Sequence, residues 1–151
     1  MEVNILANNQ NSKFDQDLCF LFYITTKEIV NRFNKYLKQY NISFPNYIVL
    51  SYIKDGEEIY VKTLCDKLHL DSGTISPIVK RLEKKNLIKR MRLPEDERKV
   101  MLRLTQKGTS LKKEFSDISS HVVEQLNLTE DEKLSYYNLM QTFVDKNLAE
   151  V

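Results

Sequence analysis

The fold is decided by one stretch of the chain, residues 70–104, which reads LDSGTISPIVKRLEKKNLIKRMRLPEDERKVMLRL. Its first half places apolar residues at the three- and four-residue spacing of an amphipathic helix, over about residues 72–85. Its second half alternates as strands do, over residues 88–92 and 99–104, with a polar loop containing Pro94 between them. This pattern predicts a recognition helix followed by a charged β-hairpin, or wing.

The same region concentrates positive charge. Residues 80–107 hold eleven Lys and Arg against four Asp and Glu, a net of +7, whereas the whole chain of 151 residues carries +2, so the rest must carry −5. A helix beside a basic ribbon suits double-stranded DNA, because Lys and Arg displace the counterions that condense on phosphates.

Helical periodicity also flanks this stretch. The predicted helices cover, in order, about residues 15–40, 45–54, 61–68, 72–85, 105–125 and 129–148. A short strand is expected at Ile59 and Tyr60, and Thr105 and Thr129 are suited to cap the last two helices. The third and fourth helices together form a helix-turn-helix.

We therefore predict a mainly α protein with a small β-hairpin, in one domain over residues 1–151. A winged helix-turn-helix at about 45–104 is flanked by dimerisation helices at about 14–40 and 105–148. The terminal helices carry more apolar surface than a small winged unit can cover, at Ile118, Val122, Leu126, Leu134, Tyr137, Leu139 and Phe143. A second copy would bury it, which predicts a homodimer.

Composition excludes several classes of protein. No apolar run reaches the roughly 20 residues that a membrane span needs, and the N-terminus lacks a signal peptide's basic start and apolar stretch, so a cytoplasmic protein is expected. Cys19 and Cys65 are too few for a disulfide framework and are expected as free thiols. With His69 and His121 they lack zinc-site spacing, so we expect no metal or other cofactor.

Four short motifs stand out along the chain: LCFLFY at 18–23, LDSGT at 70–74, KRLE at 80–83 and DER at 96–98. They resemble the MarR family of winged-helix transcription regulators, and within it the one-cysteine redox sensors of the OhrR, SarZ and MgrA type. The resemblance implies a homodimer, joined through its N- and C-terminal helices, that binds a near-palindromic operator and usually represses.

Residue chemistry selects candidate DNA contacts on the predicted helix. Ser72, Thr74 and Ser76 at its start offer hydroxyls and free backbone donors to phosphates or base edges. Lys80 and Arg81 reach further, and Arg81 suits a guanine edge. Taken alone, Ser72 is a helix cap and the two basic residues a solvated face; beside a wing, DNA contact is the better interpretation.

The wing adds four residues to the predicted interface. Arg98 at its tip resembles the family arginine that enters the minor groove, with Asp96 holding its guanidinium in position, and such charge-assisted pairs are strong. Arg90 and Arg92 on the wing strand are expected to contact the DNA backbone. In a two-fold dimer the recognition helices lie about 34 Å apart, which predicts inverted half-sites roughly 10 bp apart.

Cys19 lies early in the first helix, with Phe22 and Tyr23 on the same face three and four residues later. The resemblance implies that a peroxide oxidises this cysteine and that DNA is released. The sulfenic acid so formed can be trapped by a low-molecular-weight thiol or by another cysteine. Tyr23 is retained, but two further family tyrosines that bond the thiolate fall at Phe33 and Phe44, which lack a hydroxyl. We predict redox sensing at Cys19 and Tyr23, against the alternative that Cys19 is a small buried hydrophobe.

Other interpretations remain open. Cys65 is expected in the core. An aromatic anion can be sensed in a cleft lined by Phe14, Phe20, Phe22, Tyr36, Tyr40 and Tyr47. A thiol peroxidase begins with the same thiolate attack, but no Cys–His pair has useful spacing, so no enzyme is expected. A protein-interaction module that does not bind DNA is disfavoured by the +7 segment.

Overall fold

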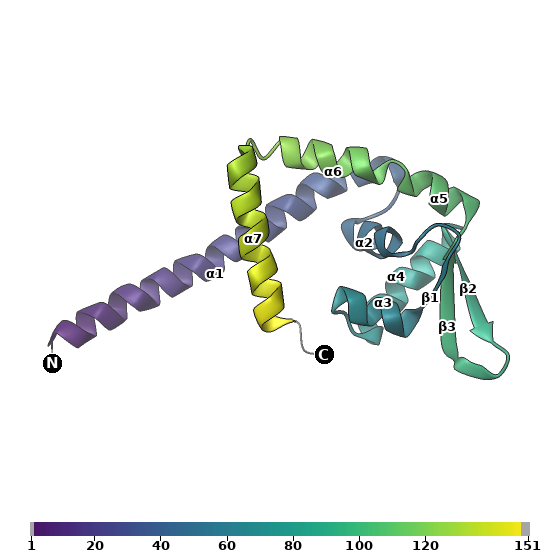
Figure 1. The fold of residues 1–151 in the computed structure, drawn as a ribbon, viewed down its shortest axis with the longest axis horizontal. Helices are drawn as coiled ribbons and strands as arrows, with labels where there is room; N and C mark the ends of the chain where they lie inside the picture. Colours follow the sequence, from purple (N-terminus) through teal and green to yellow (C-terminus); the bar gives the residue numbers. More distant parts are fainter. Residues whose placement is uncertain (1, 149–151) are drawn as a thin grey trace.

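A winged unit lies at one end of the molecule, and two long helices cross away from it (Figure 1). The computed structural model describes residues 2–148, with side chains from residue 11 onward except at position 97. The elements are α1 (Glu2–Leu37), η1 (Lys38–Tyr40), α2 (Phe44–Tyr52), β1 (Glu58–Tyr60), α3 (Val61–Leu68), α4 (Ser72–Lys84), β2 (Ile88–Leu93), β3 (Asp96–Leu104), α5 (Gln106–Lys112), α6 (Phe115–Glu124) and α7 (Glu130–Asn147). The predicted fold class, mainly α with a small antiparallel sheet, is confirmed.

Local chemistry explains where several helices begin and end. Asn41 takes the left-handed conformation at φ 56° and closes η1. Thr105 and Thr129 cap α5 and α7, as predicted, and Glu132 completes a capping box with Thr129. Asp71 caps α4 through the backbone N–H of Thr74.

The sheet has strand order β1-β3-β2, with both pairs antiparallel. The predicted hairpin is present, and β1 joins it as a third strand, with Ile59 opposite Leu102. The register of β2 and β3 shifts between Arg92 and Leu93, beside the turn that contains Pro94. The outer wing is therefore a twisted two-stranded ribbon.

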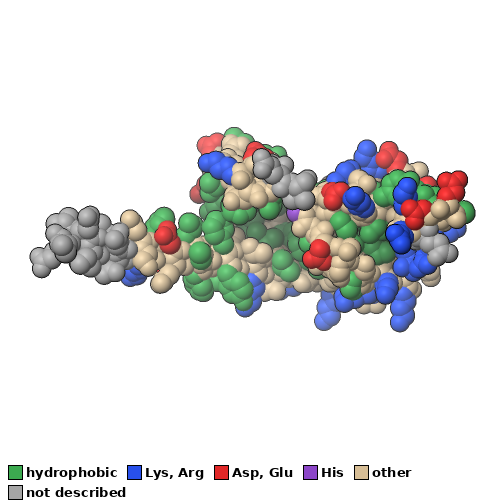
Figure 2. Space-filling view, turned by 90° about the horizontal axis from the view of Figure 1, so that it is seen from below, with side chains coloured by type: hydrophobic (Ala, Val, Ile, Leu, Met, Phe, Trp, Pro, Cys, Tyr) green, Lys and Arg blue, Asp and Glu red, His purple; other side chains and the backbone are tan. Residues whose placement is uncertain are grey.

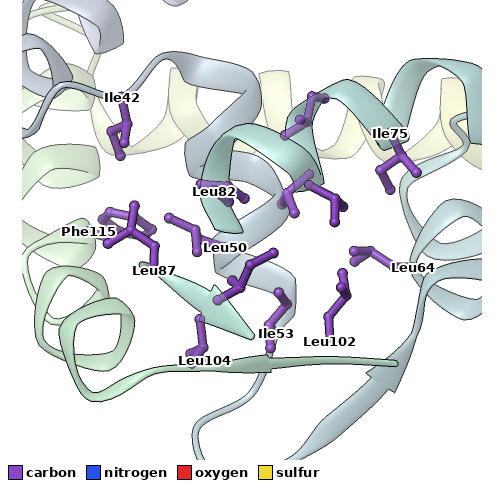
Figure 3. Close-up of a cluster of buried hydrophobic side chains, with 14 of the residues drawn as sticks. Ile42, Leu50, Ile53, Leu64, Ile75, Leu82, Leu87, Leu102, Leu104 and Phe115 are labelled. Carbon is purple, nitrogen blue, oxygen red and sulfur yellow. The ribbon is translucent and has the colours of Figure 1, made fainter. Parts of the chain in front are cut away.

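One hydrophobic core holds the winged unit together. Leu50 of α2, Leu64 of α3, Leu82 of α4 and Leu102 of β3 are fully buried and converge in Figure 3. Leu37 at the end of α1 belongs to the same cluster, which joins α1 to this unit. Among residues 2–148, no helix is long and apolar enough to cross a membrane.

The first helix begins at Glu2, so the expected start near residue 15 was wrong. Residues 2–14 contain no Gly or Pro, and nothing in that segment interrupts a helix. They also lack the apolar repeat from which a helix is recognised, since the segment is rich in Asn. The helix therefore extends further than the periodicity indicates.

The single helix expected over residues 105–125 is two helices, α5 and α6. The N–H of Glu114 bonds to the carbonyl of Leu111, a tight i→i−3 contact between the two. Just before it, the ammonium of Lys112 donates to the carbonyl of Ile53 at 2.6 Å and fixes the end of α5 against α2. That long-range contact is not encoded in local periodicity.

Helix α6 packs back on α1. Arg32 Nη1 donates to the carbonyl of Gln125 at 2.7 Å, and Gln125 Nε2 donates to the Tyr36 hydroxyl at 2.6 Å. Ile118 and Val122 are consequently buried within this chain, so their prediction as free apolar surface was wrong. Helix α7, in contrast, has no buried residue.

The start of α5 clasps the exit of α4, which we call the clasp. Thr105 N–H donates to Leu87 O at 3.1 Å, Thr105 Oγ1 donates to Asn86 O at 2.6 Å, and Lys107 Nζ donates to Lys85 O at 3.0 Å. A Cβ on Gly108 would lie 2.0 Å from Leu87 O. Only glycine permits so close an approach.

We expect Gly108→Ala to destabilise the protein, because the new methyl meets backbone and cannot be relieved by a rotamer change. Overpacking of this kind costs about 1–3 kcal/mol. The denaturant midpoint of unfolding measures it. Ser110→Ala, at an exposed position of the same helix, is the matched control and should change stability by less than about 0.5 kcal/mol. Equal midpoints for the two variants would contradict the close approach.

Candidate nucleic-acid interface

The start of α4 is open to solvent and well ordered by its cap. Asp71 Oδ1 accepts from the backbone N–H of Thr74 at 2.7 Å, and this bond holds the pKa of the Asp71 carboxyl below its usual range. Ser72, Thr74 and Ser76 are all exposed, as a contact surface requires. Ser72 and Ser76 lie four positions apart and so share one face of α4, whereas Thr74 lies on another side of the helix.

A cleft of about 860 Å³ lies between the helix-turn-helix and the wing. Of the predicted residues, it is lined by Ser72, Ser76, Lys80, Arg90 and Arg98. The structure thus brings together residues from α4, β2 and β3 that lie up to 26 positions apart in the chain. In the face shown in Figure 2, Lys and Arg side chains gather over this end of the molecule.

Two further basic residues, Lys62 and Lys99, also line the cleft, and sequence reasoning missed them. Lys62 lies in the first turn of α3, and Lys99 follows Arg98 on the wing. Their charge was visible in the sequence, but a lysine on an exposed helix face carries no signal of its own. Only the packing of α3 against the wing places them beside Arg98.

Not every predicted contact lines the cleft. Arg81, Arg92 and Thr74 are exposed but are not among the residues that line it. Arg81 follows Lys80 by one position and so lies about 100° further around α4. It faces out from the recognition helix, beside the cleft.

Asp96 contacts Arg98 differently from the prediction. Its Oδ1 accepts from the backbone N–H of Arg98 at 3.1 Å, and no ion pair with the Arg98 guanidinium occurs among the described side chains. The expected grip on the guanidinium was therefore wrong for this free chain. The short side chain of an Asp readily reaches the backbone N–H two residues further along the chain. The guanidinium at the end of the long Arg98 side chain is harder for it to reach.

Arg90 has a partner that the sequence did not suggest. Its Nη2 lies 3.2 Å from Glu83 Oε2 on α4, and both side chains are partly exposed. The pair connects the recognition helix to the first wing strand. Arg92, two residues further along β2, makes no ion pair with any described carboxylate.

Cys19 and Tyr23 lie on α1, away from this cleft, and both are exposed in the single chain. The alternative that Cys19 is buried is not what the single chain has. Cys65, expected in the core, is buried at 9% exposure, and burial together with Asp66 and Asp71 raises the pKa of its thiol. No group of three or more potential metal ligands is present in the described part of the chain.

The six aromatic residues expected around a ligand cleft do not share one. Phe14, Phe20 and Phe22 lie exposed along α1. Tyr36, Tyr40 and Tyr47 pack against the core near the other end of that helix. Tyr47 joins a cluster with Phe33, Phe44 and Phe115, at ring-centroid distances of 4.9, 5.8 and 4.6 Å.

This fold, with a basic cleft between recognition helix and wing, defines a winged-helix DNA-binding protein of the MarR type. Solved structures agree: reduced AbfR bound to DNA is similar at a TM-score of 0.73 and 25% identity, over 95% of this chain and 99% of that one. The reduced form of MarR from Escherichia coli is similar at a TM-score of 0.71 and 25% identity, over 84% and 96% of the two chains.

The family is shown by sequence. Residues 31–115 match the family model described as transcriptional regulator SarA/Rot, and the chain belongs to this family. The HTH-type transcriptional regulator SarZ of Staphylococcus epidermidis is 41% identical over 138 residues, covering 91% of this chain and 93% of SarZ. SarZ of Staphylococcus aureus is 39% identical over the same shares. The protein is thus a DNA-binding transcriptional regulator of the SarZ type, which confirms the resemblance.

We expect Cys65 to resist alkylation in the folded protein, because it is buried and its raised pKa keeps the thiol protonated. In a Cys19→Ser variant, iodoacetamide at pH 8 should label Cys65 only after urea unfolds the chain. Peptide mass spectrometry gives the extent of labelling. Labelling of the folded variant as fast as that of free cysteine would show that this thiol is accessible.

Proposed function

We propose that this regulator is a homodimeric repressor that binds a near-palindromic operator and is released when Cys19 is oxidised. The observation that carries the dimer is the apolar surface left uncovered on α1 and α7. The release step rests on the exposed Cys19 within that surface. Such a regulator acts where its DNA lies, so a cytoplasmic location is part of the proposal.

The uncovered surface, which we call the dimer strip, consists of exposed large apolar side chains of two helices. They are Phe14, Leu18, Phe20, Leu21, Phe22, Tyr23 and Ile24 on α1, and Leu134, Tyr136, Tyr137, Leu139, Met140 and Phe143 on α7. Figure 2 shows apolar side chains over this middle part of the molecule, away from the basic end.

Helix α7 of the same chain does not cover all the exposed apolar side chains of α1. Residues 20–24 are five consecutive exposed apolar side chains, and successive side chains of a helix point about 100° apart. A helix that is apolar on all sides is normally buried on all sides. The only intrachain ring contact of this segment joins Phe22 to Phe143 of α7, at 6.1 Å between centroids, among the described side chains.

A second copy is the occupant that fits best. Burying one large apolar side chain contributes about 1.5–3 kcal/mol, and thirteen are exposed in the dimer strip of each copy. An apolar groove of about 910 Å³ between α1, α6 and α7 overlaps the edge of the strip, with Ile24, Leu126 and Met140 in its lining. Two-fold pairing lets the strip of each copy fill the groove of the other.

Pairing of this kind directs two clefts to one side of a duplex. Two recognition helices about 34 Å apart enter successive major grooves, so the operator carries inverted half-sites about 10 bp apart. Ser72, Ser76 and Lys80 then approach the major groove, and Arg98 follows the wing to the adjacent groove. A repressor results when the operator overlaps a promoter.

Oxidation of Cys19 provides the release. The thiolate sulfur attacks a peroxide oxygen, the O–O bond breaks, an alcohol leaves with a proton, and Cys19 becomes a sulfenic acid; sulfur loses the two electrons that the peroxide gains. A low-molecular-weight thiol then condenses with it to a mixed disulfide and water. The added polar bulk lies inside the dimer strip and changes how α1 packs.

A ligand-driven release is the second candidate, with Cys19 structural. Its support is the groove between α1, α6 and α7, which is apolar and bordered by Lys27 and Lys133. We propose no enzymatic turnover, since neither histidine contacts either cysteine among the described hydrogen bonds. More than one peroxide consumed per subunit in the presence of a thiol reductant would reverse that view.

We expect Arg98→Ala to weaken operator binding by at least about 1 kcal/mol, because the variant loses a charge that faces DNA from the wing. Fluorescence anisotropy at physiological salt, on DNA from upstream of the protein's own gene, measures it. Lys113→Ala removes an exposed charge just after α5, outside the cleft, and is the control. Unchanged affinity of Arg98→Ala would exclude the wing contact.

We expect an organic hydroperoxide to release the wild-type protein from that DNA, and a reducing thiol to restore binding. Cys19→Ser should bind DNA normally and stay bound, whereas Cys65→Ser should be released like the wild type. Anisotropy of the preformed complex reports all three. If the hydroperoxide also releases Cys19→Ser, Cys19 is not the switch; if it releases neither protein and an aromatic carboxylic acid releases both, the ligand candidate takes its place.

A further inference from the structure

The ion pair between Glu83 and Arg90 lies at the point where the recognition helix meets the wing. The atoms Glu83 Oε2 and Arg90 Nη2 are 3.2 Å apart, and the two side chains are 37% and 30% exposed. Arg90 lines the cleft that faces DNA, together with Ser72, Ser76 and Lys80. The pair therefore lies at the edge of the cleft that is proposed to bind DNA.

The negative charge of Glu83 is an exception on a helix that is otherwise basic. Glu83 is the only acidic residue within α4, whose other charged residues are Lys80, Arg81 and Lys84. It follows Ser76 by seven positions and Ser72 by eleven, so it lies on the same side of the helix as both. An unpaired carboxylate there would repel phosphates. Paired, it cancels the charge of one arginine.

Each member of the pair is anchored at its backbone. Leu82, next to Glu83, is fully buried, and Arg90 lies opposite the fully buried Leu102 in the sheet. Between these anchored backbones, the two side chains add a link from α4 to β2. The pairing of β2 with β3 loses its regular register between Arg92 and Leu93. Arg90 therefore contacts Glu83 from the part of β2 that is still regularly paired.

We propose that Arg90 is a positioning residue: Glu83 holds it, and the pair sets the angle of the wing against the recognition helix without Arg90 binding phosphate. This inference rests on the proposed operator binding. Arg92 provides the contrast. It lies two residues on, on the same side of the strand, and is exposed with no described carboxylate within ion-pair distance.

Salt dependence separates positioning from phosphate contact. Each phosphate contact steepens the fall of log affinity with log salt by about 0.9. We expect Arg92→Gln to flatten this slope by about that amount. Arg90→Gln should keep the wild-type slope and bind the operator about 5- to 10-fold more weakly, the lower part of the range expected when one interface side chain is lost.

The opposite change tests the role of Glu83. Glu83→Gln frees the Arg90 guanidinium, so binding to random duplex DNA should tighten and its salt slope should steepen by about 0.9, while the preference for the operator falls. The double variant Glu83→Arg with Arg90→Glu exchanges the two charges and so keeps an ion pair between the same two positions. It should recover the operator affinity that either single change loses.

Anisotropy titrations from 50 to 200 mM salt, on operator and random duplexes, give every slope. A flatter slope for Arg90→Gln, an unchanged slope for Glu83→Gln, or no recovery in the double variant would each overturn the inference. Exposed ion pairs contribute little to stability, and unchanged thermal unfolding of all variants confirms intact folds. If the wild type does not prefer its upstream DNA, the operator proposal fails, while slopes on random DNA still test the pair.

Discussion

The exit of the recognition helix depends on the clasp. The N–H groups of Lys85, Asn86 and Leu87 bond the last carbonyls of α4, and the carbonyls of these same three residues are bonded in turn by Thr105 and Lys107. Thr105 also caps α5 through the N–H of Gly108. One residue thus ends the exit from α4 and begins the helix that leads to α6, so neither helix can turn without breaking bonds of the other.

That constraint gives the proposed switch a physical route. The dimer strip on α1 is tied to α6 by Arg32 and Gln125, α6 continues from α5, and α5 holds the exit of α4. In the proposed dimer, this route makes the distance between the two recognition helices depend on how α1 and α7 pack, so the proposed oxidation in the strip acts on DNA binding from a distance.

Features governed by neighbours in sequence were predictable, and those governed by tertiary contacts were not. Thr105 and Thr129 act on an N–H three residues away, so their spacing sufficed. The break between α5 and α6 follows a bond from Lys112 to Ile53, and the Glu83–Arg90 pair links two elements; neither has a local signature. Asp96 shows the reverse error, because a local bond to a backbone N–H replaced the longer contact that the resemblance implied. Five of the residues predicted to contact DNA line the cleft, but Lys62 and Lys99 join them there only through the packing of α3 against the wing.

The chemistry of Cys19 is limited by the length of α1. Phe33 follows Cys19 by fourteen residues, which is about 21 Å along a helix, so the thiol cannot reach the aromatic cluster of its own chain. Only a second copy can bring that cluster to it. There Phe33 and Phe44 stand where the resemblance implies tyrosines, and they pack at 5.0 Å between centroids with no hydroxyl to offer a thiolate. Tyr47 is the hydroxyl left in the cluster, and burial raises its pKa, so it stays a neutral donor. In the proposed switch, the sulfur of Cys19 therefore meets fewer hydroxyl donors in the partner than it would with both tyrosines, so this chain offers less hydrogen-bond support for the attack on a peroxide.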